Sequence, residues 1–306
     1  MILLLILGIF AGMLVPVQTS VNNRLSHFTH SLIMASFYSF LTGTLLLIGL
    51  NVVMNPGKLS FAFLSSHDFS YIWFLGGLMG VVYLTGNMIL LPRIGAALTV
   101  IMTVAGQMII SLFIDTFGWF DAPLQPLDIR RITGIAIMII GIIFMNYKRK
   151  SARHDDNPSN IWLFFGLMTG SIPPVQTAVN SLLRYEVGSF YMASLISFAI
   201  GTLALLLLSL LSAGHLKVAL TNQEGGRLQA WHFIGGALGA VYITTNIILM
   251  PHLGTTLTLM SVIFGQMLTG LLIDHFGLFG IPPQALDKRR IAGAIMILTG
   301  IILLQI

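Results

Sequence analysis

The chain has 306 residues, of which 56% are hydrophobic and only 8% are charged. So few charged side chains cannot cover the water-facing surface of a soluble protein of this length, which excludes that class. The formal net charge is +5, but the basic residues fall in short segments between apolar runs, a membrane-protein pattern that does not indicate a nucleic-acid partner. No cysteine is present, which excludes disulfides, thiol nucleophiles and thiolate metal sites.

Long apolar runs, separated by polar, charged or proline residues, predict the elements in chain order. A helix needs roughly 20 mostly apolar residues to cross the hydrocarbon core, and these runs lack the two-residue alternation of membrane strands. No basic residue precedes the first run, and no clear cleavage site follows it, so we expect a retained helix there. The sequence therefore predicts an all-α membrane protein with ten transmembrane helices, at 2–22, 31–53, 71–91, 94–115, 131–147, 160–182, 190–212, 230–250, 253–273 and 289–306.

The two halves of the chain repeat one another in sequence. GGLMGVVYLTGNMILLPRIGAALT from Gly76 recurs as GGALGAVYITTNIILMPHLGTTLT from Gly235, and PVQTSVN from Pro16 recurs as PVQTAVN from Pro174. Shared apolar composition would not keep Gln, Asn and Tyr at the same spacings, so we infer a duplication. The expected units are a first five-helix repeat at 1–147, a basic cytoplasmic linker at 148–159 and a second five-helix repeat at 160–306.

An odd number of helices in each repeat has a topological consequence. The second repeat enters the membrane from the opposite face, so we expect two inverted repeats, a common plan of secondary transporters. Lys148, Arg149, Lys150 and Arg153 form the densest basic cluster of the chain, and such clusters favour the cytoplasmic side. Both chain termini are therefore expected to lie outside.

Neutral polar side chains recur inside the expected spans, which hold almost no Asp, Glu, Lys or Arg. Pairs four residues apart share one helix face, and an unpaired buried amide is costly, so these faces should point inward. They either bond between helices or line a substrate cavity, and Tyr83, Asn87, Tyr242 and Asn246 are the best cavity candidates. The full set of candidate substrate-binding residues is Gln18, Asn22, Tyr83, Asn87, Gln107, Gln176, Asn180, Tyr242, Asn246 and Gln266.

A proline lies inside the first expected helix of each half. Pro16 and Pro174 lack a backbone donor, which leaves the carbonyl of Gly12 or Gly170 without its partner and predicts a kink or local break. Broken helices at matching positions of two repeats often mark a binding site. A kink that serves packing alone is an equally open interpretation.

Asp115 and Asp274 end the fourth expected helix of each half and are the deepest acids in the chain. Because ionisable groups in membranes are usually functional, they are the candidates for proton coupling. The alternative is a solvated helix end or a loop anchor, and Asp128 with Arg130 and Arg131 is expected to be structural. The histidines show no metal-ligand spacing and no catalytic motif is present, so we predict no metal, no cofactor and no catalytic residue.

These motifs resemble the drug/metabolite transporter superfamily, and within it the YdcZ-like group of bacterial inner-membrane proteins. The likeness rests on PVQTxVN at Pro16 and Pro174, on GxxYxxxNxxLxPxxG from Gly80 and Gly239, and on a GQ pair followed by IDxFGxF in each half. It covers nearly the whole chain.

The resemblance implies a fold and a location. Helices one, three and four of each half would surround a central cavity, with helices five and ten at the periphery, in the bacterial inner membrane. Some members are single repeats that pair, which leaves a homodimer open. The membrane glutamate of the small multidrug-resistance relatives is missing here, where the first helix has Pro16, Gln18 and Asn22, so export of lipophilic cations coupled to protons is not expected.

The leading hypothesis is a secondary transporter in the lipid bilayer that exports a small metabolite or drug-like solute. Alternating access between two inverted repeats would move the solute. The alternative is a membrane scaffold or chaperone module that transports nothing, against which the short loops argue. A membrane enzyme acting on lipid is disfavoured because the sequence has no catalytic cluster.

Overall fold

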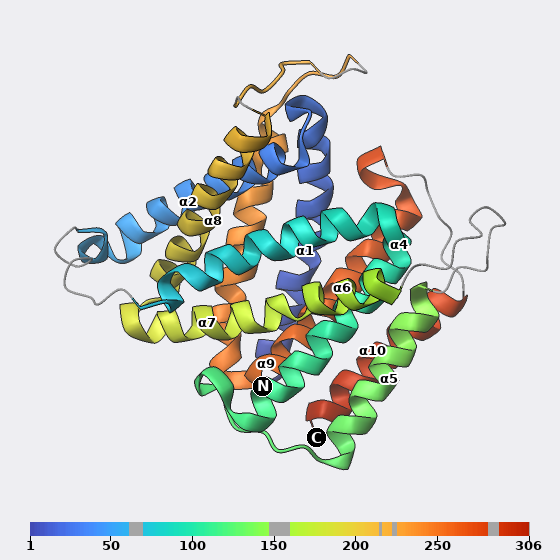
Figure 1. The fold of residues 1–306 in the computed structure, drawn as a ribbon. Coiled ribbons are helices and arrows are strands. Elements are labelled where there is room, and N and C mark those ends of the chain that lie inside the picture. Colours follow the sequence, from blue (N-terminus) through green and yellow to red (C-terminus); the bar gives the residue numbers. More distant parts are fainter. Residues whose placement is uncertain (61–69, 147–159, 214–215, 222–224, 281–287, 306) are drawn as a thin grey trace.

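The computed structural model describes residues 1–60, 70–146, 160–213, 216–221, 225–280 and 288–305. Within these ranges the chain is helical apart from its connecting segments and one isolated bridge between Thr221 and Arg227. The first half contains α1 (Ile2–Thr29), α2 (Leu32–Met54), the short 3-10 helix η1 (Pro56–Leu59), α4 (Ile72–Phe117), η2 (Trp119–Asp121) and α5 (Ile129–Asn146) (Figure 1).

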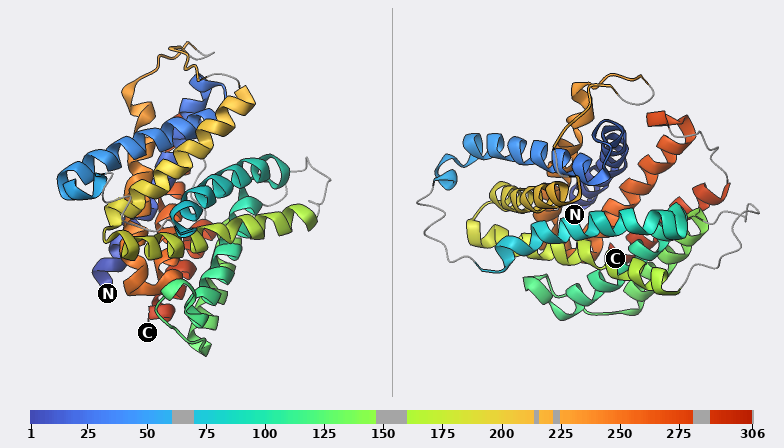
Figure 2. Two further views of the ribbon diagram at one scale, coloured as in Figure 1. Left: turned by 60° about the vertical axis from the view of Figure 1, so that its left-hand side comes forward. Right: turned by 45° about the horizontal axis from the view of Figure 1, so that its top comes forward.

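The second half repeats this order with one helix divided. It contains α6 (Asn160–Gly170), α7 (Ile172–Val187), α8 (Phe190–Ala213), η3 (Ala230–Phe233), α9 (Gly235–Phe276), η4 (Leu278–Gly280) and α10 (Lys288–Gln305). The two chain termini lie near one another in all views (Figures 1 and 2).

Two helices each join a pair of predicted spans. α4 covers the spans expected at 71–91 and 94–115, and Figure 1 shows it crossing the molecule and then turning. α9 covers those expected at 230–250 and 253–273, and Gly254, with φ 73° and ψ 174°, interrupts its helical geometry. Each joint therefore changes the direction of the chain with almost no connecting loop.

Helix one differs between the halves. α1 continues through Pro16 as one helix, so a break at this residue is not seen. In the second half, α6 ends at Gly170 and α7 begins at Ile172, just before Pro173 and Pro174. The local break therefore occurs in the second half only.

Helices from opposite halves pair in antiparallel register. Along α5 and α10, a Cβ at Gly134 would lie 2.9 Å from the Gly300 carbonyl oxygen and one at Gly141 would lie 2.8 Å from that of Gly293. This α5–α10 pair stands at one side of the bundle (Figure 1).

The pair formed by α2 and α8 has the same antiparallel register. The hydroxyls of Thr44 and Thr202 lie 2.9 Å apart, and Asn51, later in α2, donates at 3.0 Å to the carbonyl of Tyr191, earlier in α8.

Large apolar side chains cover much of the outside, for example Leu3, Ile129 and Leu211, which are 77%, 75% and 84% exposed. Such a surface suits lipid and not water. Five helical stretches among the described residues are long and apolar enough to cross a membrane: Ile2–Thr29, Leu32–Met54, Thr99–Phe117, Phe190–Ser212 and Ala230–Ile273.

Candidate functional site

Helix one of the second half presents its amide side chains to α4 of the first half. Gln176 on α7 donates from Nε2 to the carbonyl of Gly76 at 2.9 Å. A Cβ on Gly76 would overlap the Asn180 amide, and one on Gly80 would lie 2.9 Å from Gln176 Nε2. The glycines of the repeated GGxxG segment thus make room for the amides of the repeated PVQTxVN segment.

The same contact occurs with the halves exchanged. A Cβ on Gly235 of α9 would overlap Asn22 Oδ1 of α1, and one on Gly239 would lie 2.6 Å from Gln18 Nε2. Each half therefore inserts its PVQTxVN segment against the GGxxG segment of the other half. The sequence predicted that these side chains face inward but not that they pair across the two halves.

Several of these amides are buried without a hydrogen-bond partner among the described residues. Both polar atoms of Asn180 and of Asn246 are in this state, and so is Oδ1 of Asn22. Asn180 and Asn246 are each only 1% exposed. Transfer of an amide from water to an alkane-like interior without a hydrogen bond costs several kcal/mol, so a hydrogen bond from these groups to a further partner would be favourable.

The predicted tyrosines lie close to one another. The phenols of Tyr83 on α4 and Tyr242 on α9 are near enough to interact electrostatically, and both side chains are half-buried. Asn87 donates to the backbone carbonyl of Tyr83 at 2.9 Å. The Asn246 amide lies beside the Tyr242 phenol, although neither of its polar atoms has a hydrogen bond of good geometry.

Gln107 and Gln266 lie at helix crossings. Gln107 is 5% exposed and Gln266 is half-buried. Each follows a glycine at which helix one of the other half approaches closely: a Cβ on Gly106 would overlap the Leu167 carbonyl, and one on Gly265 the Ile9 carbonyl.

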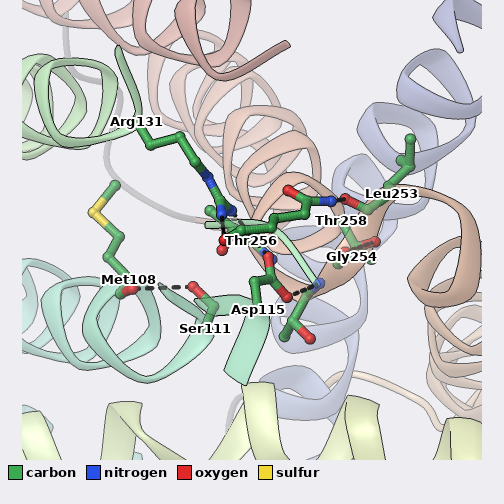
Figure 3. Close-up of polar contacts among 10 residues, drawn as sticks. Met108, Ser111, Asp115, Arg131, Leu253, Gly254, Thr256 and Thr258 are labelled. Atoms are coloured by element: carbon green, nitrogen blue, oxygen red, sulfur yellow. Dashed lines mark hydrogen bonds and ion pairs between the residues drawn. The ribbon is translucent and has the colours of Figure 1, made fainter. Parts of the chain in front are cut away.

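Asp115, at the end of α4, caps a helix of the other half (Figure 3). Its carboxylate is fully buried and accepts the backbone N–H groups of Thr255 at 2.7 Å and Thr256 at 2.8 Å. These N–H groups are available because Gly254 interrupts α9 immediately before them. Asp115 is therefore a buried anchor and not a solvated helix end.

Arg131 at the start of α5 compensates the buried carboxylate. Its Nη2 lies 3.2 Å from Asp115 Oδ2, and its side chain is 8% exposed. Its Nη1 donates to the carbonyl of Gln125, whose own Nε2 donates to the carbonyl of Leu253 at 3.1 Å. Asp128 accepts the Arg131 backbone N–H at 2.8 Å. The loop after α4 is thus tied both to α5 and to the Gly254 joint.

Gly254 is required by this arrangement for two reasons. Its φ of 73° lies in the region that glycine adopts without strain. A Cβ there would also lie 2.8 Å from Gln125 Nε2 and 3.0 Å from Asp115 Oδ2. Gly254 is the last residue of the GxxYxxxNxxLxPxxG motif, but sequence reasoning gave it no role. It missed Gln125, although the recurrence of this residue as Gln284 was a usable signal.

The counterpart Asp274 lies within α9, but its side chain is outside the described residues. Over the part of the chain that the structure describes, no three His, Asp or Glu side chains gather closely enough to hold a metal ion.

A cavity of about 610 Å³ opens where the ends of α2 and α7 meet the start of α8 and the middle of α9. Sequence reasoning gave Arg184 and His252 no functional role, and so missed this site. The lining residues are Met54, Asn55, Arg184, Tyr185, Gly188, Ser189, Phe190, Tyr191, Ile248 and His252.

Comparison with known proteins gives two findings. A family model described as "Putative inner membrane exporter, YdcZ" matches residues 3–144 and again residues 161–303. A solved structure, described only as "Crystal structure of protein", is 15% identical over 98% of this chain and 94% of its own, with a TM-score of 0.68, which shows a shared fold. No curated protein matches the chain.

Proposed function

Since the chain belongs to the YdcZ family of inner-membrane exporters, we propose that it is a secondary transporter that exports a small metabolite or drug-like solute. In this proposal ten spans form two inverted five-helix repeats, and alternating access between the repeats moves the solute. Both termini lie outside.

Helix length supports ten spans. α9 has 42 residues, which would extend about 63 Å if straight, twice the roughly 30 Å of the hydrocarbon core. α4 has 46 residues, and α6 with α7 provides one further span in two pieces. The antiparallel register of α2 with α8 and of α5 with α10 supports inversion, because equivalent helices of inverted repeats run in opposite directions.

One observation carries the proposal of alternating access: equivalent side chains of the two repeats are unequally buried. Gln176 and Asn180 are 8% and 1% exposed, whereas Gln18 and Asn22 are half-buried. An inverted pair in which each repeat can adopt the conformation of the other would reverse this difference and open the centre to the other side.

We assign the solute contacts to Tyr83, Asn87, Tyr242 and Asn246, because the two phenols are near enough to interact electrostatically and the Asn246 amide beside Tyr242 has no hydrogen bond of good geometry. Gln18, Asn22, Gln176 and Asn180 extend this polar surface along helix one of each half, with Gln107 and Gln266 at the crossings.

Asp115 is the candidate for proton coupling in this proposal. Proton coupling through it would require the carboxylate to release Thr255, Thr256 and Arg131, so its protonation would be linked to movement of the second segment of α9. Asp274 occupies the equivalent position in the sequence of the second repeat.

Metabolite profiling of medium and cell extract tests the function. Cells expressing the wild type are compared at equal membrane levels with cells expressing Asn87→Ala, Asn246→Ala, and with the control Asn23→Ala, which changes an exposed amide on α1. We expect a solute to accumulate outside with the wild type and the control but not with the double variant. Identical profiles for all three would contradict export and favour the scaffold alternative.

A further inference from the structure

Arg184 is held at the wall of the cavity by a backbone carbonyl that a proline leaves without a partner. Pro251 has no N–H to donate to Ile247, four residues earlier in α9. Arg184, in the last turn of α7, donates from Nη1 to that Ile247 carbonyl at 3.3 Å. Its guanidinium also lies 4.9 Å from the ring centre of Tyr185.

The guanidinium retains donors for a ligand. Arginine has five N–H groups, and these two contacts use one of them. The acid nearest to Arg184 in sequence, Glu186, is engaged elsewhere, because its carboxylate accepts from Trp73 Nε1 at 2.6 Å and from the Ser70 hydroxyl at 3.2 Å. The cavity lining contains Arg184 and His252 but neither Asp nor Glu.

Each of the two helices that hold this guanidinium contact, α7 and α9, carries a buried amide within one turn of it in the sequence. Asn180 is one turn before Arg184 on the same face of α7, and Asn246 directly precedes Ile247, whose carbonyl Arg184 binds. Each amide is 1% exposed, and neither has a hydrogen bond of good geometry among the described residues. Amides that can accept a further partner thus lie within one turn of cavity residues on both helices, and Asn180 also packs against Gly76 of the first half.

We propose that Arg184 and His252 form a subsite for an anionic group, a carboxylate or a phosphate, carried by the ligand that enters this cavity. A planar guanidinium binds either group through two parallel hydrogen bonds. The inference deepens the proposed transport and rests on it, since it assigns a negative charge to the solute.

Binding of simple anions tests the subsite without requiring transport. The purified chain in nanodiscs of phosphatidylcholine is unfolded thermally while sodium citrate or sodium phosphate replaces sodium chloride at constant ionic strength. Ligands that bind the folded state raise the unfolding midpoint. We expect the apparent affinity to fall about tenfold in Arg184→Gln and less in His252→Gln, whose exposed side chain can change without disturbing the fold.

Arg24→Gln is the matched control, because Arg24 also donates to a backbone carbonyl, that of Phe279 at 2.9 Å, but lies outside the cavity. It should bind the anions like the wild type. Arg184→Lys should recover part of the affinity if charge is what matters. The same midpoint shift on adding anion in wild type, Arg184→Gln and His252→Gln, or no shift in any of them, would overturn the proposal.

Two further comparisons complete the test. The first distinguishes a lipid headgroup from a free solute as the bound anion, and the second distinguishes failure of the proposed transport from failure of the anion subsite. Where citrate binds, phosphatidylglycerol in the nanodisc should weaken the apparent affinity for citrate if a lipid headgroup reaches the subsite, and should leave it unchanged if the subsite takes only free solutes. Anion binding without export of any solute would contradict transport alone. Export of neutral solutes unaffected by Arg184→Gln, together with absence of anion binding, would contradict the subsite alone.

Discussion

The two repeats contain the same PVQTxVN segment in different conformations. α1 is continuous through Pro16, whereas its counterpart is divided at Ser171. The residue before the shared proline is Val15 in the first repeat and Pro173 in the second. Two successive prolines remove two helical N–H donors, so the helix cannot continue regularly there.

The difference extends to the environment of the amides that follow. Those of the divided helix are almost fully buried, with Asn180 1% exposed, whereas Gln18 and Asn22 are half-buried. The two copies of the segment therefore lie in different local structures, and the helix break itself belongs to the Pro173 sequence. The unequal burial of the amides, and not this break, is the difference that the proposed alternating access would reverse.

The largest loss of stability is expected when the contact between Asp115 of the first repeat and α9 of the second repeat is weakened. Asp115→Asn would leave Arg131 buried without its counter-charge and weaken the cap on Thr255 and Thr256. We expect a loss of about 3 to 5 kcal/mol in the free energy of unfolding, measured by denaturant titration in detergent micelles. Asp121→Asn, at an exposed position, should be neutral. Equal stability of both variants would contradict the buried anchor.

The next largest loss of stability is expected where helix one of each repeat packs closely against the other repeat. A Cβ on Gly12 would overlap the Val262 carbonyl, and one on Gly170 would overlap that of Thr103. Each Gly→Ala variant should lose about 1 to 3 kcal/mol from overpacking. Gly49→Ala, with open space around its Cβ, should instead gain up to about 1 kcal/mol. A penalty at only one of the two equivalent glycines would refute reciprocal packing.

Pro173→Val gives the second repeat the residue that precedes the shared proline in the first, and it tests the comparison directly. It restores a backbone N–H, so we expect α6 and α7 to join and amide exchange around Ser171 to slow. A gain of about 1 kcal/mol from the new hydrogen bond should accompany a decrease in export. Val15→Pro should break α1 by the same reasoning. Unchanged exchange in both variants would show that the prolines do not determine the difference.

The smallest effect concerns the hydroxyl pair between α2 and α8. Thr44 and Thr202 are equivalent residues whose hydroxyls lie 2.9 Å apart. A double-mutant cycle with Thr→Val at both positions should give a coupling energy of about 0.6 kcal/mol, the average for such contacts in membranes. A coupling energy of zero would show that this hydroxyl pair does not stabilise the interface.

The sequence predicted the simple helices well. α2, α5, α8 and α10 begin and end within two residues of the expected spans, because charged or polar residues flank single apolar runs. It did not predict that α4 and α9 each join two spans, since the backbone geometry at Gly254 depends on a carboxylate from another helix.

Contacts between distant segments account for what sequence reasoning missed in the site. Asp115 and Thr255 are 140 residues apart in the chain, and Arg184 is 63 residues from Ile247. The repeat identified the amides and tyrosines as a set, but an alignment of the two halves with each other cannot show that each half packs against the other. That arrangement follows from the fold.

The most direct test of alternating access uses the absence of native cysteine. Asn246→Cys is labelled with a membrane-impermeant maleimide from either side of the membrane. A bifunctional thiol cross-linker then closes one end at a time, between cysteines replacing Phe28 and His232, whose rings lie 4.8 Å apart, or replacing the hydrogen-bonded pair Trp73 and Glu186. We predict labelling from both sides, with each cross-link abolishing it from one side only. Labelling from a single side, or loss from both sides with either cross-link, would contradict alternating access.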